Sequence, residues 1–350
     1  MSKNVLITGG CGFIAHHVID VLLDRTDWNI ITLDRLDYSG NLNRLAEILE
    51  SKTSEQRKRV RTVFTDLKAE INPLTASFIG PVHIILHLAA SSHVDRSITH
   101  PLECIYDNTI GTANLLEFAR KLSKEYPFDP LETFLYFSTD EIFGSAPPGV
   151  AYGEYDRYNS TNPYSASKAA AEELCVAYEN TYKIPMMITH TMNVFGERQT
   201  PEKFIPLCIN KVRKGEKIII HSNAEKTEAG SRFYIHARDV ADAIHFLITT
   251  KPESPHKIFN QPMCRKFNIV GKEEVDNLTL ARLIAKAQNK ELDYEMVDFH
   301  SSRPGHDLRY ALSGDLMRSL GWEPKIALSQ RIEEVSKWYL DNLRWLGEQP

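Results

Sequence analysis

Residues 5–15 read VLITGGCGFIA, a short apolar run that passes through three glycines into a second apolar pattern. The first run has the length and composition of a buried strand. After the glycines, Ile14, Val18 and Leu22 recur every four positions, which predicts a helix over residues 13–24. The stretch therefore predicts a strand, a tight turn and a helix, which form the first unit of an α/β fold.

The glycines of this turn have the spacing of a dinucleotide-binding loop. Gly9 and Gly12 would let backbone amides approach a diphosphate, and Ala15 is small enough for the helix to pack on the strand. Asp34 ends a second apolar run about twenty residues on, where a carboxylate accepts from the ribose of NAD and repels the 2′-phosphate of NADP. Arg35 comes next, and a cation there leaves NADP open. A glycine turn without a cofactor is the alternative, but the strand, helix and acid in register favour NAD.

The N-terminal half of the chain alternates predicted strands and helices. Strands are predicted at residues 29–34, 60–65, 83–90, 132–139 and 186–194, and helices at residues 108–122 and 165–182. Continuous apolar strands that alternate with helices are typical of a parallel sheet covered on both faces. We therefore expect a Rossmann-type, doubly wound α/β domain over residues 1–196.

Beyond residue 196 the pattern is less regular. Short strands are predicted at residues 217–220, 267–270 and 294–297, with helices at 278–288 and 327–343. We interpret residues 197–350 mainly as a smaller α/β lobe that binds the substrate. Residues 233–247, FYIHARDVADAIHFL, are the exception, since we expect them to pack back on the first domain.

The composition excludes several classes of protein. The 350 residues carry a net charge of −5, with 42% hydrophobic and 25% charged residues. This balance is ordinary for a soluble globular protein, and it favours neither a nucleic-acid-binding face nor a polybasic membrane anchor. No apolar run reaches the roughly 18 residues of a membrane span, and the first run is too short for a signal peptide. The five cysteines are scattered without paired spacing, so we expect free thiols, a cytoplasmic location and no metal site.

Tyr164 and Lys168 lie four residues apart at the start of a predicted helix, so they share one face. A phenol with a pKa of about 10 is a weak base at neutral pH. A nearby ammonium and a cationic nicotinamide ring would lower the pKa of Tyr164 and make it a usable base. Alone, the pair could be a solvated helix pair. Its place after a dinucleotide loop, a fifth strand and a turn at Asn162 and Pro163 favours catalysis.

Thr139, Asp140 and Glu141 stand where the predicted strand 132–139 ends. Ligands of open parallel sheets bind at this carboxyl edge. The hydroxyl can hydrogen-bond a reacting oxygen, while one carboxyl donates a proton and the other accepts one. The alternative is that an acid merely caps the following turn. The Tyr164–Lys168 pair on the next helix favours the catalytic interpretation.

A set of basic residues from distant segments is a candidate anion site. Arg232, Arg303 and His306 could together hold a diphosphate, because arginine binds phosphate through two parallel hydrogen bonds. Their spacing alone favours ordinary surface residues.

Seven stretches together resemble the dTDP-glucose 4,6-dehydratases, a family of extended short-chain dehydrogenases/reductases. They are residues 9–15, 87–90 (HLAA), 92–97 (SHVDRS), 139–141 (TDE), 164–168 (YSASK), 201–206 (PEKFIP) and 303–307 (RPGHD). The similarity covers nearly the whole chain. The TDE triplet is the most diagnostic element, since related epimerases and decarboxylases usually lack the Asp-Glu pair.

The resemblance implies a lyase that converts a nucleotide hexose to its 4-keto-6-deoxy form, a step of deoxysugar biosynthesis. Tyr164, assisted by Lys168 and Thr139, would remove the proton of the 4-hydroxyl group. NAD would take the hydride from C4 and return it to C6. Glu141 would remove the C5 proton, and Asp140 would protonate the departing C6 hydroxyl group.

The resemblance also implies which residues line the site. Cofactor contacts would come from Gly9, Gly12, Phe13, Ile14, Asp34, Asp66, Leu67, Leu88, Ala89, Asn108, Tyr164 and Lys168. Substrate contacts would come from Ser92, Asn193, Glu202, Lys203, Arg232, Arg303, His306 and Tyr310. In this setting Arg232, Arg303 and His306 would hold the diphosphate.

Some positions depart from the usual family sequence, namely Ser91, Phe143 and residues 191–196 and 228–234. None of them removes a catalytic group, but they leave the base and the sugar open. dTDP-glucose is the first expectation, and UDP-glucose or a UDP-N-acetylhexosamine are alternatives.

Members of the family are commonly dimers through two helices per subunit. Here these would be residues 108–122 and 165–182, with Leu115, Leu116, Leu174 and Val176 available for a twofold interface. Two rival functions stay open. One is a 4-epimerase or UDP-glucuronate decarboxylase on the same scaffold, and the other is a non-catalytic NAD-binding scaffold, which the retained reactive groups disfavour.

Overall fold

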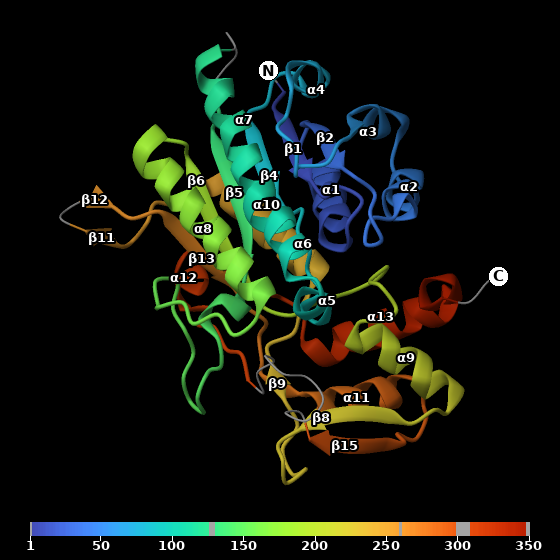
Figure 1. Ribbon diagram of the computed structural model, residues 1–350. Coiled ribbons are helices and arrows are strands. Elements are labelled where there is room, and N and C mark those ends of the chain that lie inside the picture. The colour runs from blue at the N-terminus through green and yellow to red at the C-terminus, as the bar shows by residue number, and fades with distance from the viewer. Residues whose placement is uncertain (1, 126–129, 259–260, 299–308, 348–350) are drawn as a thin grey trace.

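The computed structural model describes residues 2–125, 130–258, 261–298 and 309–347. Its main body is a seven-stranded parallel sheet with the strand order β13-β6-β5-β4-β1-β2-β3 (Figure 1). The strands are β1 (Asn4–Thr8), β2 (Asn29–Asp34), β3 (Val60–Phe64), β4 (Ile84–His87), β5 (Thr133–Thr139), β6 (Met186–Thr191) and β13 (Arg265–Ile269). The order reverses direction between β1 and β4, and an open α/β sheet binds ligands at such a point. The predicted doubly wound α/β fold is confirmed.

Helices cover both faces of this sheet. On one face α1 (Phe13–Arg25), α10 (Ala237–Thr250) and α12 (Asp315–Ser319) contribute to one hydrophobic core. On the other face α4 (Pro73–Ile79), α7 (Gly111–Glu125) and α8 (Pro163–Tyr182) contribute to a second core. In Figure 1, α7 and α8 lie side by side in front of the sheet. Because both faces are covered, the strands are apolar on both sides, which is why they read as continuous apolar runs.

The C-terminal part of the chain contributes to the main sheet as well. The strand predicted over residues 267–270, which we grouped with the smaller lobe, is β13, and it pairs in parallel with β6. The helix α10 comes from the stretch 233–247 and packs against α1. A single edge strand of five residues carries no sequence mark of the sheet it joins. The division of the chain at residue 196 stays a prediction.

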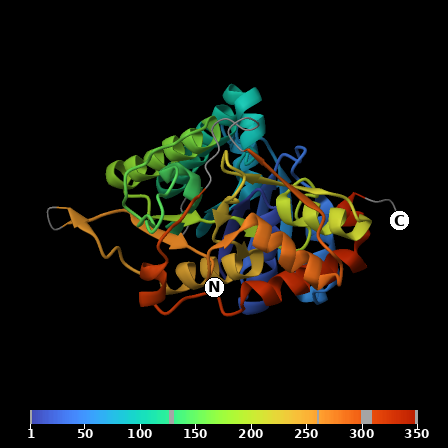
Figure 2. The same cartoon turned by 90° about the horizontal axis from the view of Figure 1, so that it is seen from below.

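The remaining C-terminal elements share a separate core beneath the carboxyl ends of the sheet (Figures 1 and 2). They are α9 (Phe204–Lys214), β8 (Ile218–Ser222), α11 (Asn277–Ala287), β15 (Tyr294–Asp298), α13 (Leu328–Asp341) and the 3-10 helix η3 (Leu343–Leu346). β15 pairs in parallel with β8. The remaining strands form short two-stranded pairs: β7 (Val194–Phe195) with β10 (Ile235–His236), β9 (Ser231–Arg232) with β14 (Val275–Asp276), and β11 (Lys257–Ile258) with β12 (Gln261–Pro262). The β11–β12 pair lies away from the C-terminal core, at the left of Figure 1 near β13.

The helix predicted over residues 108–122 has a different start. A π-helix, η1 (Tyr106–Ile110), precedes α7, and the short helices α5 (Val94–Thr99) and α6 (Pro101–Ile105) lead into it. Leu115 and Leu116 are fully buried in the core behind α7. Their use as subunit contacts is therefore wrong, because the sheet already covers them. The remaining helices are α2 (Leu42–Glu50), α3 (Ser54–Lys58) and the 3-10 helix η2 (Asp140–Phe143).

Candidate active site

The glycine turn between β1 and α1 has the geometry of an anion-binding loop. Gly9 has a φ of +69°, and the Gly12 amide donates to the Gly9 carbonyl at 2.8 Å. A Cβ atom on Gly12 would come within 2.8 Å of that carbonyl oxygen, and one on Gly9 would lie 3.0 Å from the Cα of Ala89. Because α1 begins at the next residue, its first amides face outward without a capping side chain. The turn therefore fits a dinucleotide diphosphate.

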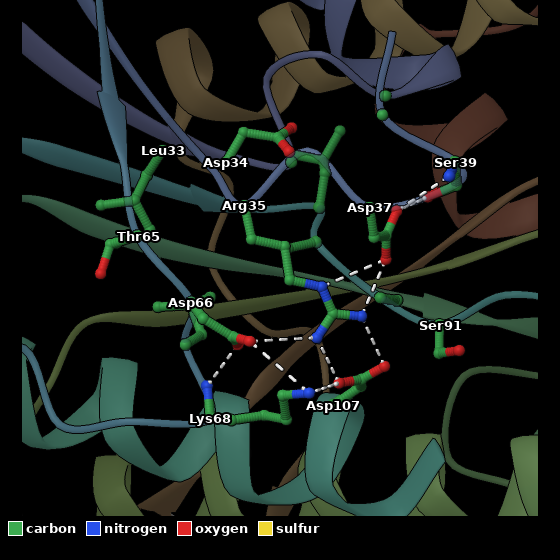
Figure 3. A pocket seen from close by; sticks show the side chains of 17 residues that line it. Leu33, Asp34, Arg35, Asp37, Ser39, Thr65, Asp66, Lys68, Ser91 and Asp107 are labelled. Atoms are coloured by element: carbon green, nitrogen blue, oxygen red, sulfur yellow. Dashed lines mark hydrogen bonds and ion pairs between the residues drawn. The ribbon is translucent and has the colours of Figure 1, made fainter. Parts of the chain in front are cut away.

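Asp34 closes one side of the adjoining pocket. Its Oδ2 accepts from the backbone N of Cys11 at 2.9 Å, and its Oδ1 accepts from the N of Leu36 at 2.8 Å. These bonds hold the carboxylate at the end of β2, where it lines the pocket drawn in Figure 3. Each carboxylate oxygen keeps a lone pair for another donor, so Asp34 fits a ribose hydroxyl group.

This first pocket brings together most of the expected cofactor residues, namely Gly9, Gly12, Asp34, Asp66, Leu67, Leu88 and Ala89. A second pocket shares Gly9, Gly12 and Leu88 with it and also contains Phe13 and Ile14. β4 ends at His87, earlier than predicted, because Leu88 and the residues after it turn to line these pockets. Asn108 lines neither one. Its amide donates to the Ser91 carbonyl at 3.0 Å and to the Ser167 hydroxyl at 2.9 Å, so it ties the pocket wall to α8.

The second pocket contains all five expected catalytic residues, Thr139, Asp140, Glu141, Tyr164 and Lys168. β5 ends at Thr139, whose hydroxyl accepts from the Glu141 amide at 3.3 Å and donates to Asp140 Oδ1 at 3.0 Å. Thr139 therefore caps the turn η2, and neither acid is needed for that purpose. Asp140 and Glu141 are left to face the pocket.

Burial governs the ionisation of the two acids. The Oδ2 atom of Asp140 is buried and has no hydrogen-bond partner. Desolvation raises the pKa of Asp140 to about 6, against the opposing charge of Arg232. Desolvation and the Asp140 charge raise the pKa of Glu141 to about 7, although Asn162 donates to its Oε2 at 3.2 Å. The two values lie within about one unit, so at pH values between them the pair shares one proton that either carboxyl group can hold, and the values do not decide which group is the acid.

Tyr164 and Lys168 occupy the first two turns of α8 and are both buried. The Lys168 Nζ donates to the Phe137 carbonyl at 2.7 Å and lies 4.2 Å from the centre of the Tyr136 ring. Burial lowers the pKa of Lys168 to about 8. Burial and the Glu141 charge raise the pKa of Tyr164 above its usual value, and a hydrogen bond with Thr139 opposes them. The predicted lowering of the Tyr164 pKa by Lys168 together with the nicotinamide ring concerns the cofactor-bound enzyme and stays a prediction.

The expected substrate residues separate into three groups. Ser92, Asn193 and Lys203 line the second pocket with the catalytic groups. Arg232 lies 4.5 Å from the centre of the Tyr310 ring, outside the lining, and its charge lowers the pKa of both Asp140 and Glu141. Glu202 does not line the pocket: it is half exposed, and its Oε1 atom lies 3.9 Å from the Nε2 of His93. Arg303 and His306 lie outside the described residues. The individual roles of all these residues stay predictions.

Several residues of the second pocket were not predicted from the sequence, among them Ser138, Thr191 and Arg44. Thr191 ends β6 and stands opposite Thr139 in the parallel register. The one available signal was that both residues end adjacent predicted strands. Arg44 is fully buried and donates to the carbonyls of Ser39 and Cys11, beside the glycine turn. Nothing in the sequence marks it.

The described residues also bear on metal binding and on membrane insertion. Among the described residues, no cluster of three or more histidine, cysteine or acidic side chains could hold a metal ion. Within the same part of the chain, no helix combines the length and the apolar character that crossing a membrane requires.

A glycine turn heading a Rossmann sheet, with a buried Tyr-Lys pair at the carboxyl edge, defines a dinucleotide-dependent enzyme of the short-chain dehydrogenase type. The model of the NAD dependent epimerase/dehydratase family matches residues 5–260, and the chain belongs to this family. Two relatives are dTDP-glucose 4,6-dehydratase of Salmonella typhimurium, 33% identical over 98% of this chain and 94% of the relative, and the human dTDP-D-glucose 4,6-dehydratase, 35% identical over 97% and 91%. A solved structure of DesIV, a dTDP-glucose 4,6-dehydratase from Streptomyces venezuelae with NAD bound, superposes with a TM-score of 0.83 at 29% identity, covering 98% of both chains.

Proposed function

We propose that this protein is an NAD-dependent nucleotide-hexose 4,6-dehydratase that acts on dTDP-glucose. The observation that carries the proposal is the pair Asp140 and Glu141 in one pocket with Tyr164 and Lys168. Epimerisation and decarboxylation need a base for the 4-hydroxyl group, but neither needs a proton donor at C6. The names of relatives that match nearly the whole chain support the same assignment.

The first pocket and the glycine turn would hold NAD, with Asp34 toward the ribose. When bound, NAD supplies a hydride acceptor for C4 and a hydride donor for C6. The turn fits this cofactor because the first amides of α1 follow Gly12 without a capping side chain, so they are available to a diphosphate. Asp66, Leu67, Leu88 and Ala89 form the remaining wall.

The residues of the chain then divide the proton transfers. Tyr164 would take the proton of the 4-hydroxyl group, with Thr139 hydrogen-bonded to the phenol. Lys168 would stabilise the phenolate, because it is buried on the same face of α8. The 4-keto group then acidifies the C5 proton, which Glu141 removes, while Asp140 gives its proton to the departing C6 hydroxyl. Water leaves as a C5=C6 double bond forms. Glu141 would then return its proton to C5 as C6 receives the hydride, which gives the 4-keto-6-deoxyhexose.

An anionic diphosphate requires local positive charge, since the whole chain has a net charge of −5. Lys203 in the pocket lining and Arg232 beside it would supply this charge, with Ser92 and Asn193 as neutral partners. Arg303 and His306 stay part of the proposal on their family match alone.

Mass spectrometry of purified protein with dTDP-glucose, UDP-glucose and UDP-N-acetylglucosamine, without added NADH, tests the function. We expect the loss of one water molecule from dTDP-glucose. Chromatography that reveals a second hexose epimer at unchanged mass would instead assign an epimerase. Asp140→Asn separates the two on the same substrates, because it should stop dehydration and leave an epimerase largely active.

We also propose a homodimer through the surface of α5, α6, η1 and α8. Apolar side chains stand exposed there at intervals of no more than four residues: Ile98, Leu102, Ile105, Tyr106 and Ile110. Such a stripe is the kind of surface that a twofold partner covers. Light scattering should give a dimer for the native protein and for Leu74→Asp, a control on α4 with 66% exposure. Leu102→Asp, with 68% exposure, should give a monomer, and an intact dimer would rule this surface out.

A cytoplasmic location completes the proposal. All five cysteines are buried and unpaired, as is usual in a reducing compartment. Fractionation of the native host, with the protein in the cytosolic fraction, is the expected result.

A further inference from the structure

Arg35, which left NADP open in the sequence, lies within a group of carboxylates in the first pocket (Figure 3). Its Nη1 and Nη2 donate to the two oxygens of Asp107 at 2.6 and 2.8 Å, a parallel pair of bonds. Its Nε and Nη2 also donate to Asp37 Oδ2 at 3.2 and 2.8 Å. The Asp66 carboxylate lies 3.5 Å from Nη1. The guanidinium therefore has a carboxylate on each of its donating edges.

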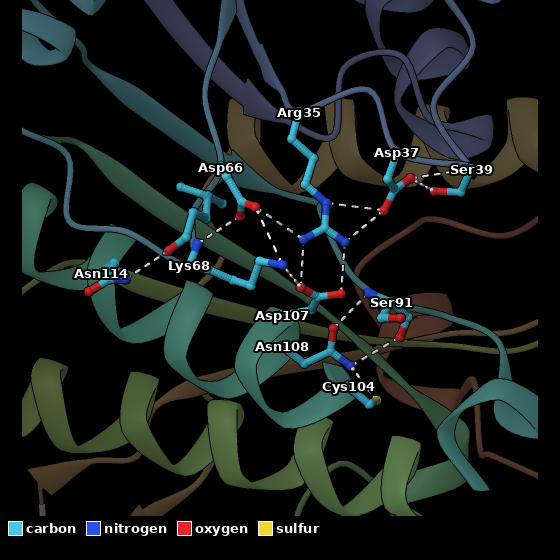
Figure 4. Close-up of polar contacts among 11 residues, drawn as sticks. Arg35, Asp37, Ser39, Asp66, Lys68, Ser91, Cys104, Asp107, Asn108 and Asn114 are labelled. Carbon is cyan, nitrogen blue, oxygen red and sulfur yellow. Dashed lines mark hydrogen bonds and ion pairs between the residues drawn. The ribbon is translucent and has the colours of Figure 1, made fainter. Parts of the chain in front are cut away.

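Asp107 is the firmest of these partners, since its side chain is only 5% exposed. It stands on the π-helix η1, next to Asn108, whose Oδ1 accepts from the Ser91 amide at 2.8 Å (Figure 4). A π-helix shifts the direction of the side chains that follow it, and such turns concentrate at functional sites. Here the π-helix η1 holds the pocket wall through the hydrogen bonds of Asn108 with Ser91, and it pairs with Arg35 through Asp107.

Asp37 is held as firmly from the other side. Its Oδ1 accepts from the Ser39 amide at 2.9 Å and from the Ser39 hydroxyl at 2.7 Å. Its other oxygen is left for Arg35. Asp37 and Arg35 belong to the same turn after β2, while Asp107 comes from the other side of the pocket, as Figure 4 shows. The arrangement is thus built from two segments far apart in the chain.

The charges of this group are unfavourable for a second anion. Three carboxylates, Asp37, Asp66 and Asp107, surround Arg35, and Lys68 is the other cation, 3.5 Å from Asp66. A phosphate entering the pocket would have to replace a bidentate carboxylate on Arg35 and approach the remaining acids. A ribose hydroxyl group is neutral, so it need not displace a carboxylate from Arg35 and is not repelled by the acids.

We propose that Asp107 and Asp37 form ion pairs with the Arg35 guanidinium and so prevent it from binding the 2′-phosphate of NADP. These ion pairs would thereby set the preference for NAD over NADP. Asp34 at the end of β2 acts on the ribose directly, whereas Asp107 and Asp37 act through Arg35. Arg35 lies where a cation could bind the extra phosphate of NADP, but its charge is neutralised by Asp107 and Asp37.

Fragment binding tests this proposal without any turnover, so its result is independent of the proposed function. Calorimetry would measure the affinities of ADP and of 2′,5′-ADP for the full-length protein. We expect the native protein to favour ADP. In Asp107→Asn the preference should move toward 2′,5′-ADP by about 10-fold, equivalent to about 1.4 kcal/mol. Asp37→Asn should move it in the same direction, and it serves as the second variant if Asp107→Asn folds poorly.

The decisive comparison places the same change in an Arg35→Gln background. If the freed guanidinium binds the extra phosphate, Asp107→Asn should produce no gain once Arg35 is absent. A gain that persists in that background would overturn the proposal in favour of a general charge effect. Glu70→Gln is the matched control, because Glu70 pairs with Lys121 and does not line the pocket. It should leave the preference unchanged, and an equal shift there would also overturn the proposal.

Discussion

The two ends of the site use the same acidic side chains in opposite ways. At the catalytic end, Asp140 and Glu141 are enclosed by the pocket, and desolvation raises the pKa values of both toward neutrality. The other end is the first pocket, which we propose holds the adenosine half of NAD and call the adenosine end. There Asp37 accepts from Ser39 and Arg35, and these donors hold its pKa below its usual value despite desolvation. Carboxyl groups therefore have a pKa near neutrality in one place, where we propose that they transfer protons, and stay ionised in the other.

The difference comes from the partners, because both groups lose water. A carboxylate that accepts two or three hydrogen bonds is stabilised as an anion, whereas one without donors is stabilised by a proton. Asp140 has a buried oxygen without a hydrogen-bond partner, while both oxygens of Asp37 accept from donors. Substitutions of Asp140 and of Asp37 should therefore differ in their effect on turnover and have opposite effects on stability.

The largest expected effect is on turnover. Asp140→Asn and Glu141→Gln keep the size of each side chain and remove its proton transfer. Each should lower kcat by about 10²- to 10⁴-fold, the usual contribution of a general acid or base. Asp37→Asn, measured at saturating NAD, is the matched change at the adenosine end and should leave kcat within a few-fold. Steady-state formation of the 4-keto sugar measures all three, and a comparable loss in Asp37→Asn would erase the contrast.

The pH dependence of kcat gives the next effect. Below about pH 6 both acids are protonated and the base is lost, and above about pH 7 both are ionised and the acid is lost. We expect a bell-shaped profile with a decline of about 10-fold per pH unit on each side. In Asp140→Asn the residual activity should keep its acid limb near the native position and lose its alkaline limb, because Asn stands for a protonated Asp140 and Glu141 stays as the base. An alkaline limb that persists unchanged would mean that Asp140 is not the acid.

The smallest effect is on stability, where the two ends should differ in sign. The folded-state pKa of Asp140 is raised from 3.8 to about 6, so its contribution is lost as the pH rises through that value. At pH 8 the free energy of unfolding of Asp140→Asn should therefore exceed that of the native protein by up to about 3 kcal/mol, which raises its unfolding temperature, and the difference should close toward pH 4. Asp37 has a depressed pKa, so Asp37→Asn should lose stability at pH 8 by less than about 1 kcal/mol, because its partners are partly exposed. Thermal unfolding at the two pH values checks both signs.

Much of the fold could be predicted because its signals are local. β2 has the bounds that the apolar run predicted, Asn29–Asp34, and the glycine turn leads into α1 at Phe13 as its spacing required. A buried parallel strand must be apolar on both faces, and a close approach of backbone to phosphate requires glycine. The five predicted catalytic residues share one pocket for a similar reason, since parallel strands end at the same edge of the sheet.

Other parts of the site depend on pairings that no local signal carries. Arg35 left NADP open in the sequence, and the structure shows that η1 brings Asp107 beside it from 72 positions further along the chain. Leu115 and Leu116 read as a free apolar surface, but they are buried once α7 lies on the sheet. The strand β13 showed no mark of its place at the sheet edge.

The sequence by itself thus determined the strand-turn-helix unit, the order of the first strands and the chemical groups at their ends, because each depends on neighbouring residues. Only the tertiary structure decided which acids are desolvated, which are paired, and which cation is neutralised. Those properties depend on water exclusion and on distances between segments remote in sequence, and a linear pattern contains neither.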